Sequence, residues 1–521
     1  MSMFPRLHRW VLHPLLLAAY PVLFLFTENV EDQMTFQALW FPLGAAIGGA
    51  AVLLLLGTAL FRDVHRAGIA ASVVVAAFFG FGHAWILVGE FLGDQRILLV
   101  VWAVAAGIGL LVAWRVRARA RFATPYLNLF VAIPLILTLV GLADFAIARA
   151  APRAVVDSGS GLLDGQAAER PDIYYLIFDR YAGSRALERH FDFDNEPFLR
   201  ELEARGFYVP RDSMANYPKT GLSLTSSLNM EYLDGDELNA DAATPADQSV
   251  IHRRFQDHLA VPASLKELGY EFVLIPSYWS PTASNVDADI TLRYEGASEF
   301  WLELVDTTLA GSLTAPSDAV DNRSQEIRNY TLYQLDRLRE VPQLAGPQFV
   351  LGHFLIPHPP YVFDRDGSEV TADEAAERGA QEEYLRQLEF TNTKILDMID
   401  EIQAQPSDDQ PVIIVQADEG PFPPRYAANG ETFQWDQATG AELEIKFRIL
   451  NAIRLPGVDP EDAGLYQSIT PVNTFRVVLN AVFDVDFPLL DDRVYAHADY
   501  LHFYDFIDVT DEIPDWPASD P

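Results

Sequence analysis

The chain has 521 residues, a formal net charge of −36 and no cysteine. So large an acidic excess repels nucleic acid and argues against a nucleic-acid partner, and the lack of cysteine excludes disulfides and thiolate metal sites. Composition divides the chain into two unlike parts. Residues 1–150 are mostly apolar and carry 10 Arg, no Lys and 7 acidic residues, whereas residues 151–521 hold 27 basic and 66 acidic residues.

Five apolar stretches in the first part are candidates to cross a membrane, which takes about 20 apolar residues in a helix. They are Trp10–Phe26, Ala38–Phe61, Ala67–Leu92, Ile97–Trp114 and Tyr126–Ala148. The first and fourth are the shortest. We therefore predict a transmembrane domain of about five helices over residues 1–149.

The short loops predict the orientation of these spans, because Arg and Lys collect on the cytoplasmic side. One set of loops is basic: Arg6, Arg9, Arg62, Arg66, Arg115, Arg117, Arg119 and Arg121. The opposite loops are acidic except for Arg96. We expect a multi-pass cell-membrane protein with a cytoplasmic amino terminus and an extracytoplasmic carboxyl-terminal domain. A cleavable signal peptide over residues 1–26 is the alternative, but no small-residue cleavage site follows Phe26.

The second part alternates strand and helix patterns. Residues 150–170 have the composition of a linker, residues 171–505 of a folded domain, and residues 506–521 of an acidic tail that adds little to the core. Strands are expected at Tyr174–Asp179, Glu271–Pro276, Gln348–Leu355, Pro411–Gln416 and Ala441–Leu455, and helices at Phe198–Gly206, Val261–Gly269, Gln325–Val341, Glu382–Gln403 and Val472–Phe483. Strands separated by helices predict a three-layer α/β domain with a mostly parallel sheet.

Two of the expected strands end on carboxylates. Asp179 closes the first, and Asp418 and Glu419 follow the strand at 411–416. Ligands collect beyond the carboxyl ends of parallel strands, so these side chains are expected to meet around a divalent metal ion. Oxygen ligands suit Mg or Mn, or Zn if histidine joins. The alternative is that acidic residues simply mark strand ends in an acidic protein.

Several histidines are further candidates. His353 lies within an expected strand and is predicted to be a hydrogen-bonded core residue. His497 and His502 could complete a site, although surface positions are the default expectation.

Four segments, in order, resemble the alkaline phosphatase superfamily, specifically its sulfatase and lipoteichoic acid synthase branch. They read PDIYYLIFDRYAG, NYPKTGLSLTSSLNMEYL, HFLIPHPPYVF and IIVQADEGP. The resemblance covers roughly residues 171–505 and implies an α/β/α alkaline-phosphatase-like (sulfatase-like) domain. Five spans followed by an external catalytic domain is also the architecture of lipoteichoic acid synthases.

The resemblance implies a role for several residues. Asp179 matches the first metal carboxylate, and Thr220 stands at the nucleophile, where it would also bind the metal. Ser223 is the nearest rival and a substrate-binding candidate, while His358 matches the histidine that contacts the substrate or leaving group. A metal ion would lower the pKa of a threonine hydroxyl enough for it to attack phosphorus. Alternatively, the hydroxyl cluster caps a helix that begins near Leu222.

The second metal segment departs from the superfamily pattern, because Asp418 is followed by Glu419 where the pattern has histidine. An anionic oxygen in place of imidazole shifts the expected ion from Zn toward Mn, Mg or Ca. Three carboxylates around one ion leave a surplus of negative charge, so a compensating cation is expected nearby. The candidates are Arg180, Lys219, Arg425, Lys446 and Arg448.

The predicted function is that of a membrane-anchored, metal-dependent phosphoester hydrolase or phospho-group transferase with Thr220 as nucleophile. Its expected substrate is a lipid or envelope-polymer phosphoester at the outer membrane face. One alternative is a sulfuric ester hydrolase, although the chain lacks the Cys or Ser with downstream Arg that sulfatases modify. Another is a catalytically silent sulfatase-like scaffold that binds the envelope, which Glu419 motivates. The sequence leaves the oligomeric state open.

Overall fold

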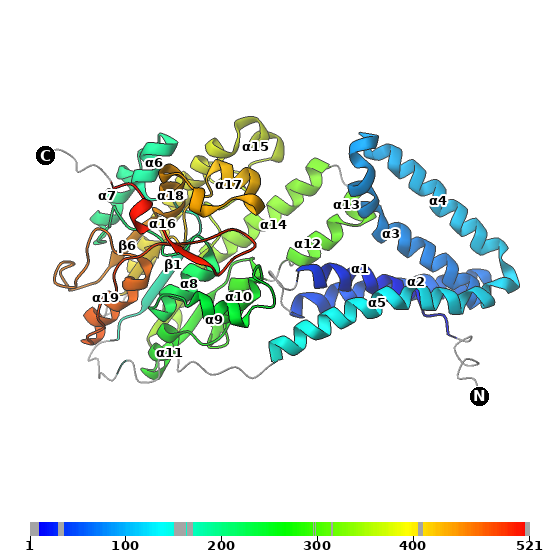
Figure 1. Cartoon of the computed structure of the whole chain (residues 1–521), viewed down its shortest axis with the longest axis horizontal. Helices are drawn as coiled ribbons and strands as arrows, with labels where there is room; N and C mark the ends of the chain where they lie inside the picture. Colours follow the sequence, from blue (N-terminus) through cyan, green and yellow to red (C-terminus); the bar gives the residue numbers. More distant parts are fainter. Residues whose placement is uncertain are drawn as a thin grey trace. The chain divides into compact units, whose positions relative to one another are not determined.

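The computed structural model describes residues 10–29, 36–150, 163, 170–294, 296, 299–313, 316–404 and 410–515. The chain forms two compact units (Figure 1). One, called the helical unit, comprises Met1–Ala154 and Ala297–Arg323; the other, called the sheet unit, comprises Val155–Gly296 and Ser324–Pro521. Most of the predicted linker lies outside the described residues.

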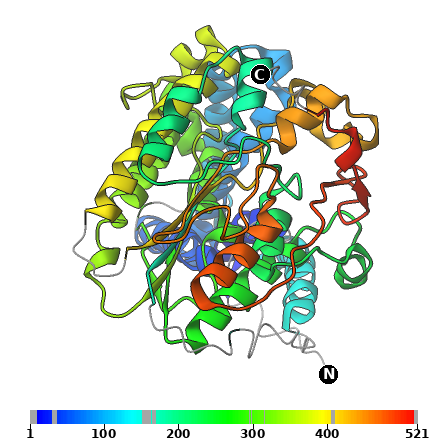
Figure 2. The ribbon, with the colours of Figure 1, turned by 90° about the vertical axis from the view of Figure 1, so that its left-hand side faces the viewer.

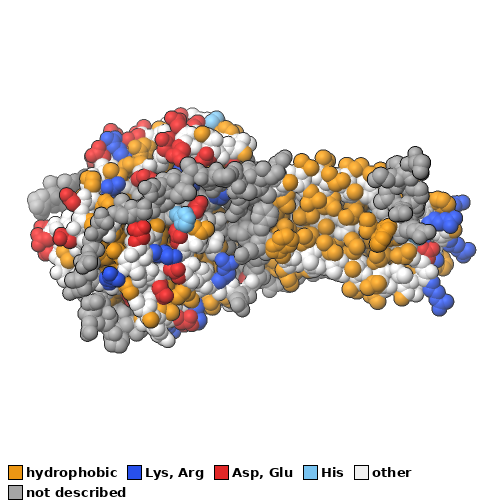
Figure 3. Space-filling model, turned by 90° about the horizontal axis from the view of Figure 1, so that it is seen from below, with side chains coloured by type: hydrophobic (Ala, Val, Ile, Leu, Met, Phe, Trp, Pro, Cys, Tyr) orange, Lys and Arg blue, Asp and Glu red, His pale blue; other side chains and the backbone are white. Residues whose placement is uncertain are grey.

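The helical unit contains the five apolar helices expected from the sequence. They are α1 (His13–Asn29), α2 (Phe36–Phe61), α3 (Val64–Leu92), α4 (Gln95–Arg115) and α5 (Ala120–Ala150). Among the described residues, 4 helices are long and apolar enough to cross a membrane, one fewer than the five spans expected, because the apolar stretch of α1, His13–Thr27, is shorter. Hydrophobic side chains cover much of this unit, and Lys and Arg gather at one end (Figure 3). The unit has the surface of a membrane domain.

Two further helices of the helical unit come from far along the chain. These are α12 (Glu299–Asp306) and α13 (Leu309–Leu313), which interrupt the domain expected over residues 171–505. Phe300 and Leu304 of α12 are buried in one cluster with side chains of α1, α2 and α5. The spacing of these two residues places them on one helix face, and that face explains why the segment packs there.

The sheet unit is built on a six-stranded sheet in the order β3-β2-β4-β1-β5-β6. The strands are β1 (Ile173–Phe178), β2 (Glu271–Ile275), β3 (Ile290–Thr291), β4 (Gln348–Phe354), β5 (Val412–Gln416) and β6 (Asn451–Arg454). All neighbours pair parallel except β5 and β6, which are antiparallel. The mostly parallel sheet is confirmed, with β1 at its centre.

Helices cover both faces of this sheet (Figure 2). Side chains of β1 alternate between two buried clusters, with Tyr174 and Phe178 in one and Tyr175 and Ile177 in the other. The first cluster includes residues of α7 (Glu196–Ala204) and α16 (Ala380–Gln403); the second includes residues of α8 (Thr220–Asn229), α11 (Ala260–Glu267) and α19 (Pro471–Phe483). The predicted three-layer α/β/α domain is therefore confirmed.

The strand predicted over Ala441–Leu455 is wrong in its first half. That half is α18 (Gly440–Phe447), and only β6 is extended. A capping box explains the difference: the Thr439 hydroxyl accepts from the backbone N–H of Glu442, whose side chain reaches back to the N–H of Thr439. Local capping starts a helix here despite the apolar residues that favoured a strand.

The acidic tail contributes more than predicted. β8 (Phe506–Asp508) pairs antiparallel with β7 (Tyr495–His497), and Val509 and Ile513 are buried in the first core cluster. The expectation of a tail outside the core is wrong for residues 506–515, because its apolar side chains alternate with the acidic ones. Residues 516–521 lie outside the described part of the chain.

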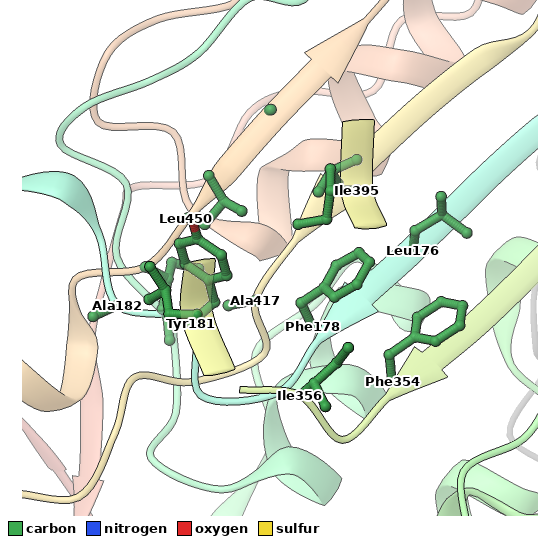
Figure 4. Close-up of a cluster of buried hydrophobic side chains, with 14 of the residues drawn as sticks. Leu176, Phe178, Tyr181, Ala182, Phe354, Ile356, Ile395, Ala417 and Leu450 are labelled. Carbon is green, nitrogen blue, oxygen red and sulfur yellow. The ribbon is translucent and has the colours of Figure 1, made fainter. Parts of the chain in front are cut away.

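Substitution of Ile395 tests the core. Ile395 of α16 is fully buried close to Leu176 and Phe178 of β1 (Figure 4). We expect Ile395→Ala to lower the free energy of unfolding by about 2–5 kcal/mol, because it leaves a cavity. Thr393→Ala, at an exposed position of the same helix, should change it by less than about 0.5 kcal/mol. Denaturant unfolding in detergent measures both, and equal effects would contradict the packing described here.

Candidate metal centre

Three side chains converge at the carboxyl ends of the central strands. Ile177 pairs with His353 of β4 on one side and with Gln416 of β5 on the other. Asp179 lies two residues after Ile177, and Asp418 lies two residues after Gln416. The carboxylates and the imidazole are buried, and one potential ligand atom from each lies within 4.8 Å of the other two. Parallel register thus brings together residues that are distant in the sequence.

These side chains leave polar atoms without partners. Within the described part of the chain, Asp179 Oδ1, both carboxylate oxygens of Asp418 and His353 Nε2 are buried and make no hydrogen bond. Unpartnered buried polar atoms cost free energy, and native structures have few of them. Two carboxylates and an imidazole are also typical ligands of divalent ions. The residues therefore fit a divalent metal ion.

The electrostatics of the cluster agree with this interpretation. Burial raises the pKa of Asp179 well above its usual value, and the nearby Asp418 raises it further. Burial also raises the pKa of Asp418. A divalent cation between the two carboxylates would favour their charged forms instead.

Thr220 lies beside this cluster. It is the first residue of α8 and is nearly buried, and its hydroxyl is close enough to Asp418 to lower the pKa of that carboxyl. Even so, neither oxygen of Asp418 accepts a well-aligned hydrogen bond within the described residues. The N-cap position belongs to Lys219, whose side chain makes no capping hydrogen bond, so capping does not explain the Thr220 hydroxyl.

Ser223 lies one turn farther along α8. Its hydroxyl donates to the backbone carbonyl of Tyr217 at 3.0 Å and is buried. An oxygen held by this bond is a poorer candidate nucleophile than Thr220.

Glu419 is held by cations rather than by the ligand cluster. Its Oε1 lies 3.0 Å from Lys446 Nζ and 3.5 Å from Arg180 Nε. Lys446 is fully buried, and its ammonium group also donates to the carbonyl of Gly420 at 2.9 Å. Glu419 does not belong to the group of close ligand atoms found in the described residues. A ligand role for Glu419 therefore stays a prediction. The third close ligand atom, which was expected from Glu419, comes from His353.

Three of the five candidate cations surround Phe422. The Arg180 guanidinium lies 4.0 Å from the centroid of its ring, Lys219 Nζ lies 4.4 Å and Lys446 Nζ 3.8 Å from it. The face of an aromatic ring stabilises a cation without neutralising it. Arg425 pairs with Glu442 and Arg448 with Asp212 and Glu444 instead. Phe422 was not identified from the sequence.

Lys219 differs from the other two cations. Its Nζ donates to the Tyr426 hydroxyl at 2.9 Å, and no carboxylate within the described ranges forms a salt bridge with it. Burial lowers the pKa of Lys219 to about 8, and burial lowers that of Lys446 to about 7. Lys219 therefore offers a cation beside Thr220 that carries no ion pair.

His358 lies at the edge of the cluster, between prolines. Its Nε2 is 4.0 Å from Asp179 Oδ2, and its side chain remains 25% exposed. Gln387 donates to its backbone carbonyl at 2.9 Å and fixes the loop. Burial lowers the pKa of His358 well below its usual value, as does Arg180 to a smaller extent, so the imidazole is neutral. This position lets it reach both the cluster and an incoming molecule.

The other histidines differ in part from expectation. His353 accepts or donates a hydrogen bond at Nδ1 with Thr282 at 2.8 Å, as a core histidine should, yet its Nε2 faces the cluster. The position of His353 near the carboxyl end of a parallel strand could have identified it as a metal ligand from the sequence. His497 is buried beside Trp435, so the expected surface position is wrong. His502 is exposed, as predicted.

Comparison with known proteins was made by sequence and by structure. No protein-family model and no curated protein matches the sequence. The chain is similar to the C-terminal periplasmic domain of EcEptC from Escherichia coli (TM-score 0.44, 13% identity, 67% of this chain and 95% of that chain). It is also similar to the integral membrane lipooligosaccharide phosphoethanolamine transferase A of Neisseria meningitidis (0.42, 14%, 90% and 95%).

A third similar structure is a protein in the alkaline phosphatase superfamily from Vibrio parahaemolyticus (TM-score 0.39, 13% identity, 64% of this chain and 74% of that chain). All three TM-scores lie below 0.5.

The metal content of purified variants tests whether the ligands include His353 or Glu419. We expect Asp418→Asn and His353→Gln to weaken metal binding by about a hundredfold or more, because even the loss of a residue that only supports a ligand costs about 10–100-fold. Glu419→Gln should keep the metal, because Lys446 and Arg180 hold this side chain. Elemental analysis of the folded, purified chain measures the outcome, with His502→Gln as control. Loss of the metal in Glu419→Gln but not in His353→Gln would contradict the assignment.

Proposed function

We propose that the chain is a membrane-anchored, divalent-metal-dependent enzyme that hydrolyses or transfers a phosphoester group, with Thr220 as nucleophile. The observation that carries this proposal is the position of the Thr220 hydroxyl next to a buried group of unpartnered ligand atoms. The arginine-rich ends of the helices support an orientation with the amino terminus in the cytoplasm and the sheet unit outside.

Asp179, His353, Asp418 and the Thr220 hydroxyl would hold the ion. Bound there, it would lower the pKa of the hydroxyl and offset negative charge that develops during phosphoryl transfer. The ion would face two carboxylates rather than three, because Lys446 and Arg180 neutralise Glu419. The surplus of negative charge expected from the sequence is thereby reduced. One imidazole among oxygen ligands keeps Zn as a candidate beside Mn, Mg and Ca.

The residues around the cluster provide the other parts of a group transfer. Thr220 gives its proton to water and its oxygen bonds to phosphorus, while the bond from phosphorus to the leaving oxygen breaks and that oxygen takes a proton from water. Lys219 and Arg180 are placed to bind the non-bridging oxygens of the phosphoryl group. His358 contacts the substrate from the exposed side. Water or an acceptor hydroxyl then releases the group from Thr220.

The substrate class follows from the anchor. A site fixed to the membrane and facing outward suits a phosphoester of a lipid or of an envelope polymer. Sulfate-ester hydrolysis is the second candidate, because the same cations would bind a sulfate group. The unpartnered buried ligand atoms count against a silent scaffold, since such a scaffold would gain nothing from keeping them.

Substitution of Thr220 tests the proposal. We expect Thr220→Ala to lower metal-dependent release of p-nitrophenol from phosphate esters by on the order of a thousandfold, because the nearest rival hydroxyl, that of Ser223, is bonded to the carbonyl of Tyr217. Thr220→Ser should keep part of the activity, and Ser226→Ala, which loses only a hydroxyl bonded to the carbonyl of Glu231, should keep most of it.

Two further measurements separate this proposal from the sulfatase alternative. A phosphate adduct on Thr220 in mass spectra would support the covalent step. Faster release of p-nitrophenol from p-nitrophenyl sulfate than from the phosphate esters would favour the sulfatase alternative. Full activity of Thr220→Ala would refute Thr220 as the nucleophile.

A further inference from the structure

The segment at residues 299–313, which forms α12 and α13, packs against the helices of the helical unit through aromatic side chains. The Phe300 ring meets Phe26 of α1 edge-on at 5.6 Å between centroids, and Trp301 meets Phe41 of α2 at 5.1 Å. Leu304 is buried in the same cluster as Phe300. α12 therefore contacts the membrane helices by specific packing.

The turn between α12 and α13 approaches α3 closely. A Cβ atom added at Gly82 would lie 2.3 Å from the backbone carbonyl oxygen of Thr307. Only glycine at position 82 lets the backbone at Thr307 come this close to the backbone of α3.

The polar groups of this turn are satisfied within the segment. Thr307 and Thr308 donate through their hydroxyls to the carbonyls of Leu304 and Val305 at 2.8 and 2.7 Å. The backbone N–H of Ala310 donates to the Thr308 hydroxyl at 3.1 Å. Backbone groups that bond internally in this way are what a segment removed from water requires.

Distances along the membrane helices give the depth of these contacts. Measured from the helix ends that carry the arginines, Gly82 lies about 27 Å along α3 and Phe41 about 30 Å along α2. Leu142 of α5, which belongs to the same buried cluster as Phe300, lies about 33 Å along its helix. The hydrocarbon core of a bilayer is about 30 Å thick. All three helices therefore place the segment at the far boundary of that core.

We propose that α12 and α13 form a second membrane attachment, seated at the boundary between acyl chains and head groups of the leaflet opposite the arginines. Its partner is the lipid of that leaflet. Trp301 joins the exposed Trp40 and Phe41 at this level, where aromatic side chains favour the interface. Asp306 is exposed and faces the head groups or water. The chain is thus fixed to the membrane after α5 and again at residues 299–313, independently of the proposed catalytic function.

The cysteine-free chain allows a direct test by single labels. Ala310→Cys adds a thiol at an exposed position of α13. The full chain, labelled there with a fluorophore, is reconstituted into phosphatidylcholine vesicles that contain lipid with a spin-label quencher either near the head group or near the end of the acyl chain. Val52→Cys, exposed near the middle of α2, is the deep control, and Asp491→Cys, whose side chain is 89% exposed, is the aqueous control.

We expect the Ala310 label to be quenched by the head-group quencher at least twice as strongly as by the acyl-end quencher, and the Val52 label to show the reverse order. The Asp491 label should be unaffected by either lipid. Absence of lipid quenching at position 310 would overturn the proposal, because it would place α13 in water. Stronger quenching from the acyl end would overturn it too, because the segment would then lie within the hydrocarbon core.

Discussion

Buried negative charge at the carboxyl edge of the parallel sheet is the constraint on which this structure depends. The register of β1 with its two neighbours brings Asp179, Asp418 and His353 together away from water. Two carboxylates in such surroundings repel each other, and they stay charged only with positive charge between or around them, because otherwise their pKa values rise and they take up protons. The proposed divalent ion would supply this charge together with the three cations around Phe422.

The Glu419–Lys446 pair shows how this chain departs from the pattern its motifs resemble. A glutamate in place of a ligand histidine would overload one ion with negative charge, but a buried lysine 3.0 Å away neutralises it. An imidazole is available instead from β4, on the other side of β1, at His353. Arg180, directly after Asp179, adopts a left-handed backbone conformation (φ 61°), which non-glycine residues rarely do and which often marks functional sites.

Periodic patterns in the sequence predicted most of the sheet unit, because continuous apolar runs identify buried strands and the residues that end them. Asp179 and Asp418 were identified as candidates in this way, whereas the resemblance to the superfamily implied Thr220. His353 was expected only as a core residue, because a strand pattern does not show which nitrogen of a buried imidazole faces a site. Lys446 could not be ranked, since it lies on a helix that the sequence presented as a strand. The return of residues 299–313 to the membrane helices depends on tertiary packing, which no local pattern reveals.

The three strands that supply the cluster come from early, middle and late parts of the chain, which affects how the protein is made. Asp418 leaves the ribosome long after Asp179, so the complete group of side chains exists only once most of the polypeptide has been synthesised. On the proposed function and orientation, loading with metal would follow synthesis and take place at the outer surface, and a prematurely terminated product would lack part of the site. Availability of metal outside the cell, rather than in the cytoplasm, would then set how much of the protein becomes active.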